Sequence, residues 1–143
     1  MKYKYILQEM KESGDPNVLA FLNDTAKIKR LSKQERDYFL QNRNMPGAVK
    51  KLVEGFIPYA IFVAYSNSHK TNRLSVLDLI NEGILGAYGA FERNQKRGYT
   101  LTKRSVNSSI KSSIRRAVMK DCNTPFEDIA LEDVEIDNLK RYI

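Results

Sequence analysis

Apolar residues recur every three or four positions along most of the chain, and no stretch alternates strictly between apolar and polar residues. A repeat close to 3.6 residues is typical of amphipathic helices, whereas strict alternation indicates β-strands. Glycine and proline, which interrupt helices, are sparse at 7 and 4 residues. The sequence therefore predicts an all-α protein, folded as a compact bundle of helices.

Three short helices are expected in the first part of the chain. The first covers residues 3–11, and Pro16 suits the opening turn of the second, where a backbone N–H is not needed. The third follows Ser32, since Ser32 and Glu35 have the spacing of a capping box, in which each side chain accepts a hydrogen bond from the other residue's backbone N–H. Residues 44–47 are expected to end this helix.

A longer helix is expected over residues 46–65, because its apolar positions form a wide stripe of the kind that faces a core. Pro58 lies inside this segment, where it removes one backbone hydrogen bond and crowds the carbonyl of Glu54. A kink is therefore predicted at this point. The polar stretch 66–73 is expected to form a loop.

The next helix is expected to begin after Ser75, whose hydroxyl can cap it, with Asp78 in its first turn. Gly83, Gly86 and Gly89 do not follow a strand, so they indicate close helix packing rather than a phosphate-binding loop. Six apolar residues of this helix are predicted to face inward: Leu77, Ile80, Ile84, Ala87, Tyr88 and Phe91.

A basic turn at residues 94–98 leads to a last long helix, expected over residues 102–120. At 100° per residue, one side of this helix gathers the apolar residues Val106, Ile110, Ile114 and Ala117. A cationic ridge forms the opposite side, with Arg116 at its edge and Lys103 apart from it. The ridge consists of Arg104, Ser108, Lys111, Ser112 and Arg115.

Charge divides the chain into a basic body and an acidic tail. Residues 1–120 contain 22 Lys or Arg and 10 Asp or Glu, whereas residues 121–143 contain 2 and 7. Three parts are expected: N-terminal helices in residues 1–45, a helical domain in residues 46–120, and the tail, with a short helix within residues 131–142. A basic body favours a polyanionic partner, and the alternative is a soluble basic domain with a solvating tail.

Several classes of function are not expected. The longest apolar run is far shorter than the roughly 20 residues of a membrane span, and charges interrupt the apolar part of the N-terminus, unlike in a secretory signal. One cysteine and one histidine do not make a Cys/His zinc site, so we expect no metal and no cofactor, in a reducing cytoplasm. His69 lies in a polar stretch, and Asp121 beside Cys122 disfavours a thiolate, so we do not expect an enzyme.

The cationic ridge is the main candidate for a binding site. Its charges can neutralise phosphates, and its short hydroxyls permit close approach to a nucleic-acid backbone, although many basic helix faces are only solvated. Tyr99 can stack on an unpaired base or can pack on the helix before it. The candidate DNA-binding residues are Tyr99, Lys103, Arg104, Ser108, Lys111, Ser112, Arg115 and Arg116.

An acidic patch interrupts this basic body. Asp78, Asn81 and Glu82 are spaced i, i+3 and i+4, which places them on one helix face, opposite Ile80 and Ile84. The patch is either an exposed polar face, with Asp78 favoured by the first turn of the helix, or a docking site for a basic protein surface. Spacing alone is compatible with both interpretations.

In their order, these segments resemble bacterial sigma factors, the promoter-specificity subunits of RNA polymerase. The similarity covers the second conserved region of the family and the short helical region before it. It is strongest in LDLINEGILG, residues 77–86, and weaker over residues 110–118. The other matching segments are LSKQE (31–35), LVEGFIP (52–58), IFVA (61–64), AFE (90–92) and RGY (97–99).

The resemblance implies a specific partner for the acidic patch. In sigma factors this patch binds the coiled-coil clamp helices in the largest β-like subunit of core RNA polymerase. Asp78, Asn81 and Glu82 are thereby assigned to polymerase binding. The patch is negative because its partner is positive, and such complementarity fixes orientation and partner choice.

The helix that follows in the family reads and melts the −10 element of promoter DNA, using aromatic residues that trap unpaired bases. Where the family has a tyrosine and a tryptophan pair, this chain has Arg104 and VNSS at residues 106–109, and it contains no tryptophan. Opening of the duplex would then depend on Tyr99, on positive charge or on the polymerase. The resemblance places Lys111, Ser112, Arg115 and Arg116 where the family contacts the −10 duplex, so base contacts are still expected from these residues. Arginine can bond guanine through two hydrogen bonds, and serine can bond several bases.

Sigma factors usually continue into a helix-turn-helix region that reads the −35 element, whereas this sequence ends 23 residues after Lys120. It therefore resembles a minimal sigma factor of the type that bacteriophages encode for late genes, which works with a co-activator or a sliding clamp. The tail is expected either to dock on such a partner or to be disordered. The alternative function is a protein that occupies the clamp helices and inhibits or redirects host transcription, and a third is a DNA-binding regulator that never contacts polymerase.

Overall fold

A computed structural model describes residues 3–97 and 101–122, and every element in these ranges is helical. The predicted all-α fold is therefore confirmed for the described part of the chain. The predicted helix within residues 131–142 lies outside it. The elements are α1 (Tyr3–Glu12), α2 (Pro16–Ala26), α3 (Lys33–Gln41), α4 (Ala48–Glu54), α5 (Ile57–Asn67), the 3₁₀ helix η1 (Ser68–Lys70), α6 (Val76–Arg97) and α7 (Lys103–Cys122).

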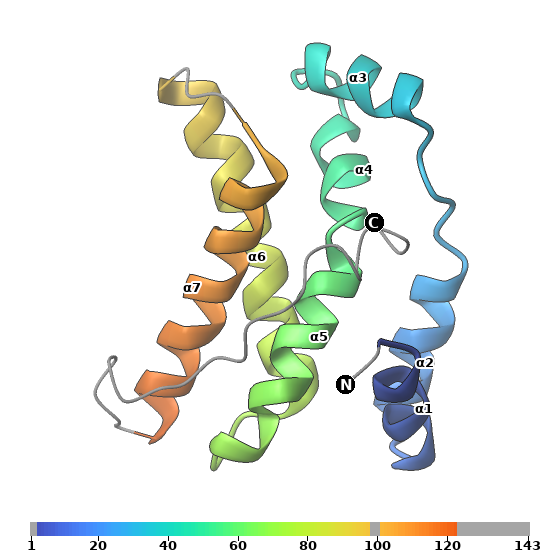
Figure 1. Cartoon of the computed structure of the whole chain (residues 1–143), viewed down its shortest axis with the longest axis vertical. Helices are drawn as coiled ribbons and strands as arrows, with labels where there is room; N and C mark the ends of the chain where they lie inside the picture. The colour runs from blue at the N-terminus through green and yellow to red at the C-terminus, as the bar shows by residue number, and fades with distance from the viewer. Residues whose placement is uncertain (1–2, 98–100, 123–143) are drawn as a thin grey trace.

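The helices form one bundle in which α6 and α7 are an antiparallel pair (Figure 1). This pair makes the most extensive helix–helix contact, and α5 packs against both of its members. α4 and α5 follow each other through the middle of the molecule, with α6 and α7 on one side and α1 and α2 on the other (Figure 1). Within the described ranges, no other helix covers the outer faces of α6 and α7 (Figure 1).

The helix starts follow the capping chemistry that the sequence predicts. Ser32 Oγ accepts the N–H of Glu35 at 3.1 Å, and the Glu35 carboxylate accepts the N–H of Ser32 at 3.2 Å, so the capping box of α3 is confirmed. These hydrogen bonds from Ser32 lower the pKa of the Glu35 carboxyl. Pro16 occupies the first turn of α2, as predicted, and Ser75 with Asp78 starts α6.

The single kinked helix predicted over residues 46–65 is wrong, because this segment forms two helices. α4 ends at Glu54 and α5 begins at Ile57, with the interruption at Gly55. Pro58 lies in the first turn of α5, where the N–H that proline lacks has no intrahelical partner to lose. The proline therefore starts a helix instead of bending one.

Other boundaries also differ from the prediction. Residues 94–97, predicted as a turn, continue α6, and α7 runs on to Cys122. α5 extends to Asn67, and η1 occupies Ser68–Lys70, so part of the predicted loop is helical. Polar residues such as Lys, Arg and Gln are good helix formers, so a polar stretch does not by itself end a helix.

The predicted apolar face of α7 is confirmed. Val106, Ile110 and Ile114 are buried, and Ala117 packs against the core with partial exposure. Val118 is also fully buried, because it follows Ile114 by about one helical turn. These side chains join residues of α1, α2, α4, α5 and α6 in one core.

On α6, the predicted inward residues Ile80, Ala87 and Phe91 are buried, and Leu77 and Ile84 are half-buried. The buried stripe is wide because α5 and α7 both pack against this helix. None of the helices in the described ranges is long and apolar enough to cross a lipid bilayer.

Two glycines of α6 permit close approach of its neighbours, as predicted. A Cβ atom at Gly83 would lie 3.0 Å from the side chain of Ile114. A Cβ atom at Gly86 would lie 2.5 Å from Ser113 Oγ and 2.7 Å from the backbone oxygen of Ser109, closer than real Cβ atoms come. Gly86 therefore sets the separation between α6 and α7.

Two polar contacts tie distant parts of the chain together. The Asp121 carboxylate at the end of α7 accepts the backbone N–H of Asn72 at 2.6 Å and that of Arg73 at 3.3 Å, which fixes the segment before α6. The Tyr65 hydroxyl on α5 donates to the Glu9 carboxylate on α1. This hydrogen bond raises the pKa of Tyr65.

Candidate interaction surfaces

The acidic patch lies on the uncovered side of α6. Asp78, Asn81 and Glu82 are all exposed, in agreement with the face that their spacing predicts. Neither the Asn81 side chain nor the Glu82 side chain forms a hydrogen bond or ion pair with another residue of the described ranges. Their polar groups are therefore directed to solvent and are accessible to a partner.

Asp78 also has a structural role. Its carboxylate accepts the N–H of Ser75 at 2.9 Å, and its own N–H donates to Ser75 Oγ at 3.2 Å. This reciprocal pair satisfies two N–H groups at the start of α6. The Asp78 carboxylate therefore has to serve both the helix cap and any partner, whereas the Glu82 carboxylate takes no part in the cap.

Two exposed apolar side chains lie next to the acidic patch, on the same side of α6. Leu85 is 63% exposed and Tyr88 is 37% exposed. The inward orientation predicted for Tyr88 is wrong, because the buried stripe passes through Ala87 and Phe91. Tyr88 follows Ala87 directly, so its side chain is rotated by about 100° from that stripe, toward solvent. We use the term α6 face for the five exposed residues Asp78, Asn81, Glu82, Leu85 and Tyr88.

The α6 face combines the two chemical features of a docking surface. Carboxylates orient a basic partner, and adjacent exposed apolar side chains supply area that binding can remove from water. The sequence prediction missed Leu85, although its position seven residues after Asp78 places it on the same side of the helix.

The cationic ridge of α7 lies opposite the core face, as the helical period predicts. Arg104, Ser108 and Arg116 are exposed. Tyr99 lies outside the described residues. The half-buried candidate DNA-binding residues are Lys103, Lys111, Ser112 and Arg115.

A polar cavity of about 190 Å³ lies between Arg93 of α6 and the ridge side of α7. Arg93 on α6 donates through Nη2 to Ser109 Oγ at 2.7 Å, and Arg116 on α7 donates through Nη2 to Ser113 Oγ at 3.3 Å. Guanidinium groups and hydroxyls together suit a phosphate oxygen. The cavity is lined by Arg93, Ser108, Ser109, Ser112, Ser113 and Arg116.

The sequence prediction missed three of these residues, Arg93, Ser109 and Ser113. It considered α7 alone, and the ridge was therefore restricted to one helix. Gly86 was the available signal that residues of α6 could join the ridge. Because this position has no side chain, α6 approaches Ser109 and Ser113 closely, and Arg93 can bond Ser109.

Two residues of the segment 106–109 are turned inward. Val106 is 1% exposed and Asn107 is 3% exposed. The Asn107 amide bonds to no other residue of the described ranges. These two positions therefore offer no surface on which an unpaired base can stack.

The residues with catalytic chemistry are scattered. His69 is exposed on η1, and the thiol of Cys122 donates to the Val118 carbonyl at 2.8 Å. Within residues 3–97 and 101–122, no group of three or more His, Cys, Asp or Glu side chains is arranged to hold a metal ion.

Neither a family model nor a curated protein nor a solved structure matches this chain. The exposed residues on α6 and α7 and the order of the sequence motifs are therefore the features that bear on function.

Proposed function

We propose that this protein is a sigma-like transcription initiation factor. It binds core RNA polymerase through the α6 face and directs the enzyme to promoters with a −10-like element, for the late genes of a bacteriophage. The observation that carries the proposal is the exposure of Asp78, Asn81 and Glu82 on one side of the helix that bears the LDLINEG motif.

The chemistry of the α6 face supports a basic protein partner. The acidic patch attracts a cationic helix pair and repels nucleic acid, in contrast to the rest of the body, which is strongly basic. Polymerase clamp helices are the partner that the motif implies. Leu85 and Tyr88 supply apolar area beside the charges, which favours a protein over a polyanion on this surface.

The chemistry of α7 supports a DNA partner on the neighbouring surface. Arg104 and Arg116 are exposed, and the cavity beside Arg116 presents a second guanidinium from Arg93. Phosphate contacts of this kind position DNA, and base contacts from the same helix supply sequence preference. The protein would act in the bacterial cytoplasm, with a co-activator or sliding clamp as a further partner.

Reconstituted transcription tests this proposal. The full chain is added to core RNA polymerase and promoter-bearing DNA, and start-site-specific transcripts are measured. The double variant Lys111→Glu/Arg115→Glu is expected to abolish these transcripts while polymerase binding persists. The matched double variant Lys50→Glu/Arg73→Glu reverses two exposed charges outside the ridge and is expected to leave transcription unchanged. Specific transcripts that survive the ridge variant would overturn the assignment of α7.

A second function is supported by the buried Val106 and Asn107 and by the absence of tryptophan from the sequence. A protein that lacks base-trapping aromatic residues can bind the clamp helices and block or redirect the host enzyme. In the same assay, polymerase binding accompanied only by inhibition supports this second function, whereas new specific transcripts support the first.

A further inference from the structure

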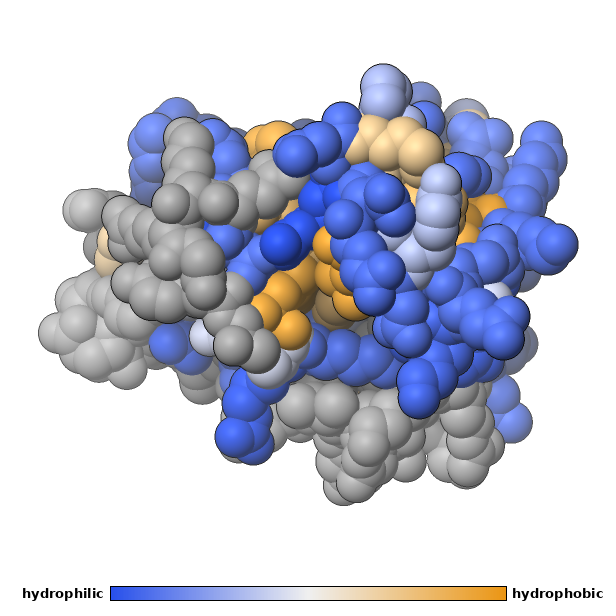
Figure 2. All heavy atoms as spheres, turned by 90° about the horizontal axis from the view of Figure 1, so that it is seen from above, coloured by the Kyte–Doolittle hydropathy of each residue, from blue (hydrophilic) through white to orange (hydrophobic). Residues whose placement is uncertain are grey.

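A large apolar groove opens at the end of the bundle where α7 begins. Its volume is about 440 Å³, within the range of roughly 300–1,000 Å³ that is typical of ligand sites. Seen from above, apolar atoms lie in a hollow among polar ones (Figure 2). The apolar lining comes from several helices and the segments between them, and it includes Leu31, Leu40, Phe56, Phe91, Leu101 and Val106.

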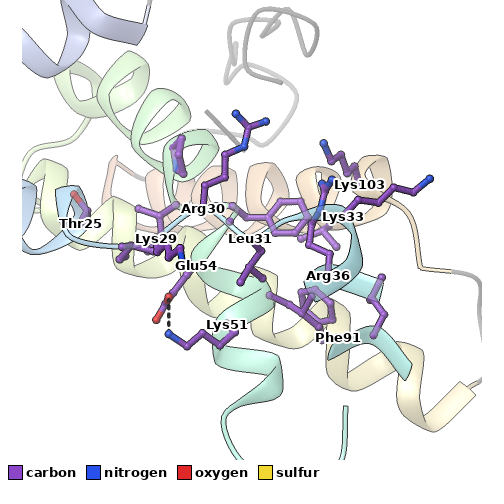
Figure 3. Close-up of a pocket in the computed structure, with 18 of the residues that line it drawn as sticks. Thr25, Lys29, Arg30, Leu31, Lys33, Arg36, Lys51, Glu54, Phe91 and Lys103 are labelled. Atoms are coloured by element: carbon purple, nitrogen blue, oxygen red, sulfur yellow. Dashed lines mark ion pairs between the residues drawn. The ribbon is translucent and has the colours of Figure 1, made fainter. Parts of the chain in front are cut away.

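The rim of this groove is basic. Figure 3 shows Arg30, Lys33 and Lys103 at one side of the groove, and an ion pair between Lys51 and Glu54, with Nζ and Oε2 4.0 Å apart, at the other. Among the described residues, only two acidic ones line the groove, Asp37 and Glu54. The basic lining residues are Lys11, Lys29, Arg30, Lys33, Arg36, Lys51 and Lys103.

This combination favours an occupant that is both apolar and acidic. A polyanion complements the charge of the rim but brings few aliphatic groups to the floor, and a purely apolar ligand brings no negative charge to the rim. A peptide in which carboxylates alternate with aliphatic side chains satisfies both requirements.

We propose that the groove binds the C-terminal segment of the same chain, residues 131–143. This segment reads LEDVEIDNLKRYI, with four acidic and two basic residues among its apolar ones. Glu132, Asp133, Glu135 and Asp137 complement the basic rim. The apolar residues available for the floor are Leu131, Val134, Ile136, Leu139, Tyr142 and Ile143.

The length of the chain allows this docking within one molecule. α7 has 20 residues and is therefore about 30 Å long, with the groove at its start and Cys122 at its end. About ten extended residues span that distance, at roughly 3.3–3.6 Å per residue. Docking residues that begin near 131–133 therefore match the reach of the chain. A short tether also gives the segment an effective concentration on the order of millimolar, which a separate partner has to exceed.

Paramagnetic relaxation in the full chain tests the proposal. A nitroxide is attached at Asn138→Cys, a polar position that is assigned to neither the rim nor the floor, in a Cys122→Ser background, and broadening of backbone amide signals is measured. We expect loss of the signals of Leu31, Lys33 and Thr102 at the groove, while Asp78 at the far end of α6 keeps its signal. Because the label is on the tail, the groove itself is unaltered.

Charge reversal on the rim supplies the matched comparison. Lys29→Glu/Lys33→Glu is expected to abolish the broadening at Leu31 and Thr102, and Lys50→Glu/Arg73→Glu, which reverses two exposed charges away from the groove, is expected to preserve it. The amide spectra of both variants show whether the fold is intact.

Three results would overturn the proposal. In the first, the groove residues show no broadening. In the second, the rim variant shows as much broadening as the labelled wild type. In the third, broadening appears only between a labelled and an unlabelled molecule in a mixed sample. The last result means that the segment docks on a second copy. The outcome is independent of polymerase binding, so the proposed function is tested separately.

Discussion

At the scale of single residues, Gly86 determines how α6 and α7 meet. The closest approach at this position is to Ser113 and to the backbone of Ser109, and backbone cannot move aside as the end of a flexible side chain does. The same close approach brings Arg93 to Ser109 at 2.7 Å. One glycine thus affects both the packing of the helix pair and the polar cavity beside the ridge.

Gly86→Ala is expected to lower the free energy of unfolding by about 1–3 kcal/mol, since the added methyl group overpacks the helix interface. Chemical denaturation measures this change. Gly89→Ala is the matched control, because its Cβ would meet only the end of the long Arg93 side chain, at 3.3 Å, and no backbone atom. That variant is expected to be neutral or more stable by up to about 1 kcal/mol, from helix propensity. Equal destabilisation by both variants would contradict the role given to Gly86.

At the scale of helices, α1 is held to α5 partly by the hydrogen bond from Tyr65 to Glu9. The bond raises the pKa of Tyr65, so the folded protein holds this proton more tightly than the unfolded chain does. Its contribution to stability is therefore fully present below the unfolded pKa of about 10 and is lost as the pH rises through the folded pKa.

Tyr65→Phe is expected to lower the free energy of unfolding near neutral pH and to reduce its decline above about pH 10. Urea denaturation of the wild type and the variant across this alkaline range provides the comparison. If both proteins lose stability with the same dependence on pH, the bond to Glu9 does not stabilise the docking of α1.

The sequence predicted helix starts better than helix ends. Ser32, Ser75 and Pro16 were placed correctly because capping and the first turn depend on local chemistry. The break at Gly55 and the continuation of α6 through residues 94–97 were not predicted. These boundaries depend on what packs against the helix, which a single sequence does not show.

The same limit applied to the candidate surfaces. The exposed position of Asp78, Asn81 and Glu82 followed from helical spacing. Helical spacing did not predict that Arg93 lines the polar cavity, and it did not predict the groove near Leu31. Both features join segments that are distant in sequence. The exposure of Tyr88 was missed because a tyrosine at the border of a stripe is compatible with either side.

At the scale of the whole molecule, charge is separated onto different surfaces. The α6 face is acidic, the ridge of α7 is basic, and the groove has a basic rim that includes the candidate DNA-binding residue Lys103. An acidic segment docked in the groove would therefore compete with DNA for part of the positive surface. Release of that segment would raise the affinity of the protein for DNA.

Glu135→Gln/Asp137→Asn in the full chain is expected to tighten binding of the free protein to duplex DNA, on the order of tenfold for a change of 1.4 kcal/mol. Fluorescence anisotropy at fixed salt measures the affinity. Glu12→Gln/Asp24→Asn removes the same charge from exposed positions of α1 and α2. Equal tightening by both variants would attribute the effect to net charge and would contradict competition by the docked segment.

The central claim is that the α6 face binds core RNA polymerase, and gel filtration of the two together tests it most directly. The full chain is expected to co-elute with sigma-free polymerase of its host, and Glu82→Lys is expected to abolish co-elution without altering the fold. Asp24→Lys introduces the same change at an exposed site on α2 and is expected to co-elute like the wild type. Failure of the wild-type chain to co-elute, or co-elution unaffected by Glu82→Lys, would contradict the claim.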